Sequence, residues 1–419
     1  MVHRMGEGRV DFVFLYHPHP YEVDPSAQLG LGLLLLATYA EKLGASVRVI
    51  NAQSASIKEA ILAIPKCVNL MMYGCLIDTP ILGAICGQVS PLIAPNIFIG
   101  GPITISKPTP VGKAIYIDGY GEDLMAVLVD KRTVFCNTSK LEHNINYYPF
   151  PDRSLIEGPF GGKIFKGSDS KVSTTLLTSR GCKYACAFCT SGTDKFCEEY
   201  DLDRVEKELE HCLSLGIRDI RISDDNMLHD RERLAYLCAI FKGAKIRWRG
   251  STRTHPNDPE LYEMMADSGC EELSFGVESG ESKILKLLNK NATVAQNSTA
   301  IRNAKKAGIF TRALMMMGTP GETNHTLARN IGWVKEAKPD MVSLKMFIPY
   351  PGTDIYHNPK KYKCKIHLPL RETNNSAYRP NKSNPEASID SEELYRVELT
   401  RQFLEMRSWL EMKGLANHG

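Results

Sequence analysis

Short apolar strands that alternate with helical segments constrain the fold of this chain most strongly. The first third of the chain has apolar runs at residues 11–16, 47–50, 68–73, 96–99 and 114–118, and the segments between them have the spacing of apolar residues that is typical of helices. Strands joined by helices of this length form parallel sheets with helices on both faces. We therefore predict a doubly wound α/β domain over residues 1–136, whose ligand would lie at the carboxyl ends of the strands.

Glycines follow three of these predicted strands and would let backbone approach a flat or phosphate-bearing ligand. Taken singly, each is also explained by ordinary turn chemistry. No G-x-G-x-x-G run follows the first strand, which disfavours a nicotinamide-binding domain. The candidate ligand contacts of this domain are Gly74, Gly100, Gly101, Gly119, Gly121 and Glu122.

A second α/β series begins further along the chain. Residues 137–171 break the alternation with a segment rich in Pro and Gly, which predicts a linker. After it, six units of strand and helix begin with apolar runs at 174–178, 219–222, 245–249, 272–275, 310–316 and 341–347. Parallel strands that each end in a polar or Gly/Pro loop predict a partial (β/α)6 barrel over residues 172–358, with its site at the carboxyl-end face.

The last residues, 359–419, predict a small extension that ends in an amphipathic helix at 391–413. Segment 360–382 holds seven Lys or Arg residues and one Glu, which indicates either a solvated loop or a lid over an anionic substrate. The net charge of the whole chain is only +3, so nucleic acid is not an expected partner. Because the first residues lack the apolar core of a signal peptide and no apolar run could span a bilayer, we predict a cytoplasmic protein without a transmembrane segment.

Three cysteines, Cys182, Cys186 and Cys189, follow the first barrel strand with the spacing C-x3-C-x2-C. Three thiolates this close together indicate a metal. A structural zinc site needs a fourth ligand, for which the candidates are Cys197, His211 and His229. An iron–sulfur cubane held by three cysteines instead leaves one iron open. Such an iron can chelate the amino and carboxylate groups of an amino-acid-like ligand and pass it one electron.

In its strand and loop context, this cysteine loop resembles the cluster loop of the radical S-adenosylmethionine (radical SAM) enzymes. The resemblance implies that the three cysteines are metal ligands and catalytic residues that hold a [4Fe-4S] cluster. In that superfamily the cluster binds S-adenosylmethionine and cleaves it to methionine and a 5'-deoxyadenosyl radical. The resemblance also implies an external electron donor such as a flavodoxin or ferredoxin.

The later strand ends are similar to those of the same family. By this resemblance Phe188 packs near the adenine, and Asp224 or Asp225 receives the amino group of the methionine part. Arg253 meets its carboxylate, although an internal salt bridge between Arg253 and Glu278 is an alternative. The implied contacts to the ribose and the adenine are Ser274, Glu278, Gly318 and Pro320.

The order of segments over about residues 10–355 resembles the cobalamin-binding branch of this superfamily. Its members carry cobalamin on the N-terminal doubly wound domain. The axial-histidine motif D-x-H-x-x-G of other cobalamin proteins is absent. His17 and His19, after the first strand, could reach the edge of a ligand or be ordinary loop histidines.

The resemblance implies a cobalamin-dependent methyltransferase in which the radical takes hydrogen from an unactivated carbon that methylcobalamin then methylates. The substrate would be a small molecule or a peptide, and the basic segment 360–382 favours an anionic one. One alternative is an oxidative cyclase or ring-rearranging enzyme with the same cofactors and no methyl transfer. Further alternatives are a radical SAM enzyme whose N-terminal domain binds no cobalamin, and a non-catalytic zinc or nucleotide-binding protein.

Overall fold

The computed structural model describes residues 9–19, 29–75, 78–104, 112–117, 119, 121–130, 144–158, 160–162, 164–165, 172–191, 197–368, 370 and 386–416. The chain forms two compact units. One consists of Met1–Thr175 and Glu206–Ile217, and the other of Leu176–Val205 and Arg218–Gly419.

The first unit contains a six-stranded sheet in the order β5-β4-β3-β1-β2-β6, and its neighbouring strands pair in parallel. The strands are β1 (Val10–Tyr16), β2 (Val47–Asn51), β3 (Cys67–Tyr73), β4 (Asn96–Gly100), β5 (Ile115–Tyr116) and β6 (Ile156–Glu157). The helices are α1 (Leu31–Lys42), α2 (Ile57–Ala63), α3 (Thr79–Gln88) and α4 (Gly121–Val129). This sheet confirms the predicted doubly wound domain.

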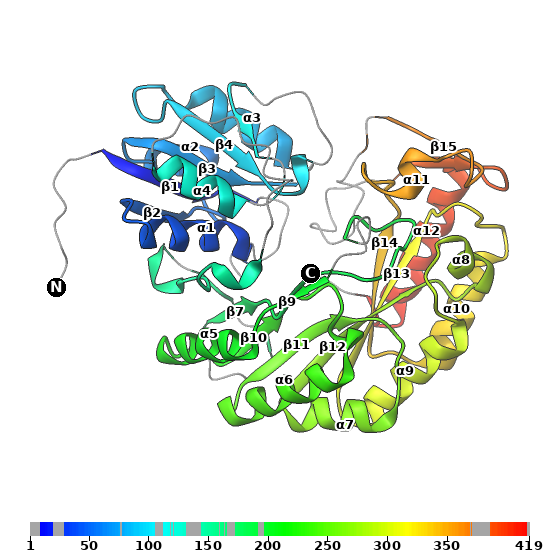
Figure 1. Cartoon of the computed structure of the whole chain (residues 1–419). Coiled ribbons are helices and arrows are strands. Elements are labelled where there is room, and N and C mark those ends of the chain that lie inside the picture. Colours follow the sequence, from blue (N-terminus) through cyan, green and yellow to red (C-terminus); the bar gives the residue numbers. More distant parts are fainter. Residues whose placement is uncertain are drawn as a thin grey trace. The chain divides into compact units, whose positions relative to one another are not determined.

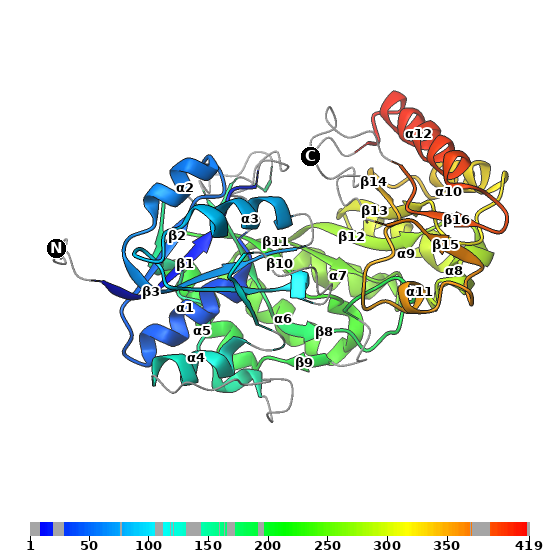
Figure 2. The ribbon, with the colours of Figure 1, turned by 90° about the horizontal axis from the view of Figure 1, so that it is seen from above.

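Both faces of this sheet are buried, which explains the continuous apolar runs of its strands. Along β1, Phe12 and Phe14 belong to the core that α1 and α4 cover, whereas Val13 and Leu15 belong to the core under α2 and α3. The helices accordingly lie in two layers, one on each side of the strands (Figure 2). Alternate side chains of one strand therefore anchor both helix layers.

The segment predicted as a linker contributes structure to this unit, which sequence periodicity did not indicate. Strand β6 pairs with β2 through only two residues, too few to show a period. Beside it, Arg153 is fully buried and donates to Glu208 Oε1 at 2.6 Å. It also donates to Thr174 Oγ1 at 2.9 Å and to the backbone oxygens of Pro151 and Thr175.

A second sheet has the order β14-β13-β12-β11-β10-β7 and is open at both ends; all of its strands except β7 lie wholly in the second unit. Its strands are β7 (Ser173–Leu176), β10 (Asp219–Ile222), β11 (Arg247–Thr252), β12 (Cys270–Glu278), β13 (Phe310–Met317) and β14 (Met341–Met346). The intervening helices are α5 (Leu202–Ser214), α6 (Arg231–Ala244), α7 (Pro259–Asp267), α8 (Ser282–Leu287), α9 (Val294–Lys306) and α10 (Thr326–Ala337). Helices α6 to α10 line the outer side of the curved sheet (Figure 1), so the predicted partial barrel is confirmed.

Smaller elements complete the second unit. They are the antiparallel pair β8 (Ser179–Gly181) and β9 (Cys197–Glu199), helix α11 (Asp354–His357), the antiparallel pair β15 (Cys364–Ile366) and β16 (Ile389–Ser391), and helix α12 (Arg396–Met412). Helix α12 contacts α10, β13 and β14, as predicted for the amphipathic segment. Most of the basic segment 360–382 lies outside the described residues. Within the described ranges, no helix has the length and apolar character needed to cross a bilayer.

Candidate active site

The three cysteines lie between β8 and β9, and all three side chains are half-buried. The strands of this ribbon pair from Ser179 with Glu199 to Gly181 with Cys197, so the cysteine loop leaves the ribbon directly after Gly181. Gly181 has φ of 84°, a backbone conformation that favours glycine. The chain is therefore turned sharply just before its first candidate ligand.

Two segments far away in the sequence hold the cysteine loop in shape. Ala187 N donates to Leu288 O at 2.9 Å, and the side chain of Asn289 donates to Ala185 O at 2.6 Å. From the other side, Ile355 N in α11 donates to Ala187 O at 3.1 Å. The loop between Cys186 and Cys189 is thus fixed through its backbone, which presents the thiols in a set geometry.

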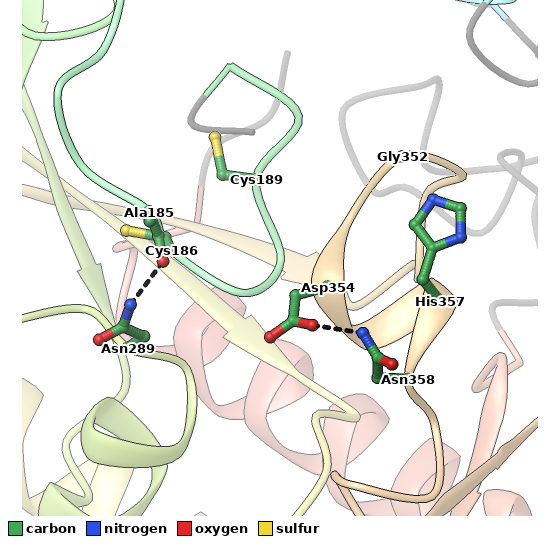
Figure 3. A pocket seen from close by; sticks show the side chains of 8 residues that line it. All are labelled: Ala185, Cys186, Cys189, Asn289, Gly352, Asp354, His357 and Asn358. Carbon is green, nitrogen blue, oxygen red and sulfur yellow. Dashed lines mark hydrogen bonds between the residues drawn. The ribbon is translucent and has the colours of Figure 1, made fainter. Parts of the chain in front are cut away.

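A cavity of about 320 Å³ opens beside this loop. Its walls are Ala185, Cys186 and Cys189 from the loop, Asn289, and four residues at or near α11, Gly352, Asp354, His357 and Asn358. Figure 3 shows Asn289 bonded to Ala185 on one side and Asp354 bonded to Asn358 on the other. Two thiols therefore border a hollow of the size used by small-molecule ligands.

Arg253 lies against the cysteine loop. Its guanidinium stacks on the ring of Tyr184, with Cζ 3.8 Å from the ring centroid, and its Nη1 donates to Cys186 Sγ at 3.3 Å. Its Nη2 is buried without a hydrogen-bond partner in the described part of the chain. The backbone N of Arg253 donates to Asn226 Oδ1 at 3.2 Å. Arg253 thus combines a contact to a candidate ligand with an unused, buried donor.

Glu278 pairs with Lys290 and not with Arg253, so the predicted alternative of an Arg253–Glu278 salt bridge is wrong. Lys290 Nζ donates to Glu278 Oε1 at 2.7 Å, and the two side chains are only 6% and 9% exposed. A Cβ at Gly276 would lie 2.6 Å from Lys290 Nζ, so any larger residue there would displace the ends of this pair. Lys290 Nζ also lies 6.0 Å from the ring centroid of Phe188, the predicted adenine neighbour. Glu278 therefore has a structural partner beside its predicted ribose contact.

The two neighbouring carboxylates after β10 have different surroundings. Asp224 is buried and accepts from Thr178 N at 2.7 Å and from Ser179 Oγ at 2.8 Å, which joins it to the start of β8. Asp225 is exposed. Burial raises the pKa of the Cys189 thiol, and the nearby charges of Cys186 and Asp225 add to this rise. Of the two predicted amino-group contacts, Asp225 is therefore the one whose carboxylate is left exposed, whereas Asp224 is committed to Thr178 and Ser179.

The other predicted contacts of this unit lie within a strand or in the loop after one. Ser274 is half-buried on β12, in register with Ser251 and Arg312 of the neighbouring strands. Gly318 follows β13 with φ of 86°, and Pro320 is buried in the same loop. Glu322 organises this loop, because it accepts from Thr319 N at 2.9 Å and from Thr319 Oγ1 at 3.0 Å.

In the first unit, the predicted glycines stand after strands, but packing explains several of them without a ligand. A Cβ at Gly74 would lie 2.7 Å from Leu82 Cδ1, one at Gly101 2.6 Å from the Tyr73 ring, and one at Gly121 2.9 Å from Leu36 Cδ1. Gly100 would meet only an ordinary contact, 3.9 Å from Ile117 Cβ. Gly119 has φ of 89°, and Glu122 is buried at the start of α4. A ligand role for these residues stays a prediction.

The zinc hypothesis loses two of its candidate fourth ligands. The ring nitrogens of His229 lie 2.7 Å from Glu199 Oε1 and 2.8 Å from Asn226 O. His211 Nε2 accepts from Arg153 N at 3.1 Å. Sequence reasoning missed Asn226, Asn289 and Lys290, because nothing in their local pattern marks them; each acts through a contact that only the fold creates.

Comparison with known proteins agrees with the geometry of the second unit. Residues 176–334 match the model of the Radical SAM superfamily. The chain is 30% identical over 221 residues to an uncharacterised methyltransferase of Pyrococcus horikoshii, covering 52% of this chain and 47% of that protein. It is also 30% identical over 188 residues to the anaerobic magnesium-protoporphyrin IX monomethyl ester cyclase of Cereibacter sphaeroides, covering 42% of this chain and 30% of that protein. The chain thus spans less than half the length of these two relatives.

Among solved structures, the chain is similar to the radical S-adenosylmethionine methyltransferase TsrM of Kitasatospora setae, determined with cobalamin and a [4Fe-4S] cluster bound. The TM-score is 0.64 at 17% identity, and the match covers 83% of this chain and 77% of TsrM. An identity this low speaks for the fold alone. Residues 176–334, with the cysteine loop near their start, therefore match the Radical SAM superfamily, and the chain shares its fold with TsrM.

Proposed function

We propose that this protein is a cobalamin-dependent radical SAM enzyme that methylates an unactivated carbon of a small molecule or peptide. The observation that carries the proposal is the arrangement around Cys186, where Arg253 contacts the sulfur, Cys189 follows in the same loop, and a cavity borders both. A relative named as a methyltransferase supports the reaction, and the fold shared with TsrM supports a corrinoid.

The residues of the cysteine loop fit a [4Fe-4S] cluster with bound S-adenosylmethionine. Cys182, Cys186 and Cys189 would hold the cluster, and the buried, unpaired Nη2 of Arg253 is a donor that a carboxylate would satisfy. Asp225 would accept from the amino group. Once bound, the cluster and S-adenosylmethionine supply a 5'-deoxyadenosyl radical.

The protein itself would position the ligand and limit its freedom. The Arg253 side chain is held by the Tyr184 ring and by Cys186 Sγ, and its backbone is held by Asn226, so little side-chain entropy remains to be lost when its guanidinium binds. The Glu278–Lys290 pair, close to Phe188, would keep that side of the site rigid. Such preorganisation is what lets binding energy orient a reactive species and keep water from it.

The first unit offers a suitable edge for cobalamin, which supplies a methyl group when bound. Gly100 ends β4, and Gly74, Gly101 and Gly119 follow strands, all at the carboxyl end of the sheet. At the same edge, His19 Nδ1 and Asp78 Oδ1 are buried and have no hydrogen-bond partner within the described ranges. These two atoms face each other at 3.6 Å, so a buried polar pair lies at the edge where doubly wound sheets bind ligands.

A second candidate function keeps both cofactors and lacks methyl transfer. It is favoured by the relative named as a magnesium-protoporphyrin monomethyl ester cyclase, which has the same 30% identity to this chain as the methyltransferase, over a shorter match. In either case we propose a flavodoxin or ferredoxin as the electron donor, which suits the cytoplasmic location expected from the sequence. The excess of Lys and Arg in segment 360–382 is the only support for an anionic substrate.

Anaerobic purification and labelling test the proposal. The reconstituted protein should show a cluster absorbance that is lost in the Cys182→Ala, Cys186→Ala, Cys189→Ala triple variant, and it should retain a corrinoid. With methyl-labelled S-adenosylmethionine and a substrate that triggers deoxyadenosine formation, the label should enter the product. Deoxyadenosine without label in the product would replace the methyltransferase with the cyclase-like reaction, and zinc binding without any cluster would end both proposals.

A further inference from the structure

A pair of histidines and an aspartate lie at the point where the first sheet reverses its strand order. From β1 the chain proceeds to β2 on one side, whereas β3 lies on the other side of β1, so the switch falls between β1 and β3. Ligands of doubly wound sheets bind at this position, outside the carboxyl ends of the strands. His17 and His19 follow β1 there, and Asp78 follows β3.

His17 is a fixed support and not a free ligand. Its side chain is 2% exposed, and its ring nitrogens lie 3.1 Å from Pro18 O and 2.9 Å from Tyr73 O. The His19 ring stacks on it, with the centroids 4.8 Å apart and the planes 29° from parallel. The backbone N of His19 donates to Gln53 O at 2.9 Å. Ring and backbone of His19 are therefore both held in place.

His19 turns one ring nitrogen toward Asp78 and leaves the other accessible. Its Nδ1 is buried and lies 3.6 Å from Asp78 Oδ1, slightly beyond a hydrogen bond, and neither atom has another partner in the part of the chain that the structure describes. The other oxygen of Asp78 accepts from Cys75 N at 2.7 Å. The His19 side chain is 21% exposed against 2% for His17 and 2% for Asp78, and its Nε2 is not among the buried, unpaired atoms of the described residues.

This arrangement is the one that proteins use to prepare a histidine for a metal. A metal-bound histidine usually directs its other N–H to a carboxylate, which fixes the tautomer and makes the ligating nitrogen more basic. We propose that His19 Nε2 is an axial ligand of the cobalt of bound cobalamin, and that Asp78 orients it. The inference rests on the proposed function, because it needs a corrinoid at this edge.

A separate metal ion between these side chains is less well supported. His17, His19 and Asp78 together have ligand atoms within 4.8 Å of one another. However, the ring nitrogens of His17 already face backbone oxygens, and Asp78 Oδ2 is taken by Cys75 N. Only two side chains, His19 and Asp78, then remain to give one ligand atom each, fewer than a tight divalent-ion site uses.

Electron paramagnetic resonance of the cobalamin-loaded, full-length protein tests the assignment. In the cob(II)alamin state an axial nitrogen splits each cobalt line, into a triplet for the ordinary isotope and a doublet for the heavy one. Protein grown with heavy-nitrogen histidine and loaded with unlabelled cobalamin should give doublets. Both His19→Ala and His19→Gln should lose the doublets and keep the corrinoid, and Asp78→Asn should lower the fraction of cobalt that shows them. His325→Ala, at an exposed histidine before α10, should change nothing.

Three results would overturn the assignment. Triplets in the labelled protein would mean that the base of the cofactor is the ligand, and unsplit lines would mean that no nitrogen binds. A stoichiometric metal ion held by His19 and Asp78 in cobalamin-free protein would give the two residues another role. If the wild-type protein retains no corrinoid, this inference and the cobalamin part of the proposed function fail together, whereas a bound corrinoid with unsplit lines removes the axial ligand alone.

Discussion

Arg253 offers the sharpest test of how the site would bind S-adenosylmethionine, because one of its terminal nitrogens is already hydrogen-bonded and the other is not. Nη1 contacts Cys186 Sγ at 3.3 Å, whereas Nη2 is buried and unpaired among the described residues. A hydrogen bond to a charged group contributes about 1.5–3 kcal/mol. Arg253→Met should therefore raise the KM for S-adenosylmethionine by roughly tenfold to 150-fold, since each 1.4 kcal/mol is a factor of about ten.

The assay is the rate of deoxyadenosine formation as a function of S-adenosylmethionine concentration, with iron content and absorbance measured on the same samples. Arg253→Lys should show an intermediate loss, because an ammonium cannot reproduce the two-pronged contact. Arg247→Met is a control at the start of β11, the strand that Arg253 directly follows, and this arginine forms a partly exposed salt bridge with Glu271. A KM that stays within twofold of wild type in protein with a full cluster would refute the carboxylate role. If the variant loses part of its cluster but the cluster-containing fraction keeps the wild-type KM, Arg253 supports the cluster through Cys186 and does not bind the carboxylate.

Three further predictions concern the supports of the site. Lys290→Met leaves the Glu278 carboxylate buried and unpaired and should cost about 3–5 kcal/mol in unfolding free energy, measured by urea denaturation, whereas Lys286→Met at an exposed position should cost little. Burial raises the pKa of Glu322 from its ordinary 4.5 to about 7, so protonated Glu322 stabilises the fold below pH 4.5, and this contribution, on the order of 3 kcal/mol, is lost as the pH rises to about 7. In Glu322→Gln the free energy of unfolding should change less with pH across that window. An equal pH dependence in both proteins would contradict this. Gly101→Ala should lower the melting temperature because Gly101 has φ of 93° and a Cβ there would press on the Tyr73 ring, while Gly32→Ala, in α1 with open space around it, should raise or keep it.

Sequence reasoning succeeded where the signal is local. The cysteine spacing and the apolar runs of β1, β3 and β13 are each contained in a few consecutive residues, so both sheets and the cysteine loop were predictable. It failed for β6, whose two residues carry no periodicity and are ordered instead by their pairing with β2. The charges of Arg153 and Glu208 are 55 residues apart, and only the fold brings them together.

The two carboxylates after β10 show why a site cannot be completed from a motif. Asp224 and Asp225 are adjacent and chemically alike, so the sequence left both as candidates for one role. The fold separates them, because Asp224 turns inward to bond with Thr178 and Ser179, while Asp225 stays exposed. Asp224→Asn should therefore act on the folding of the β8 ribbon and on cluster retention, and Asp225→Asn on the KM for S-adenosylmethionine with the cluster kept. If instead Asp224→Asn raised the KM and Asp225→Asn lost the cluster, Asp225 would not be the ligand contact, and that role would pass to Asp224.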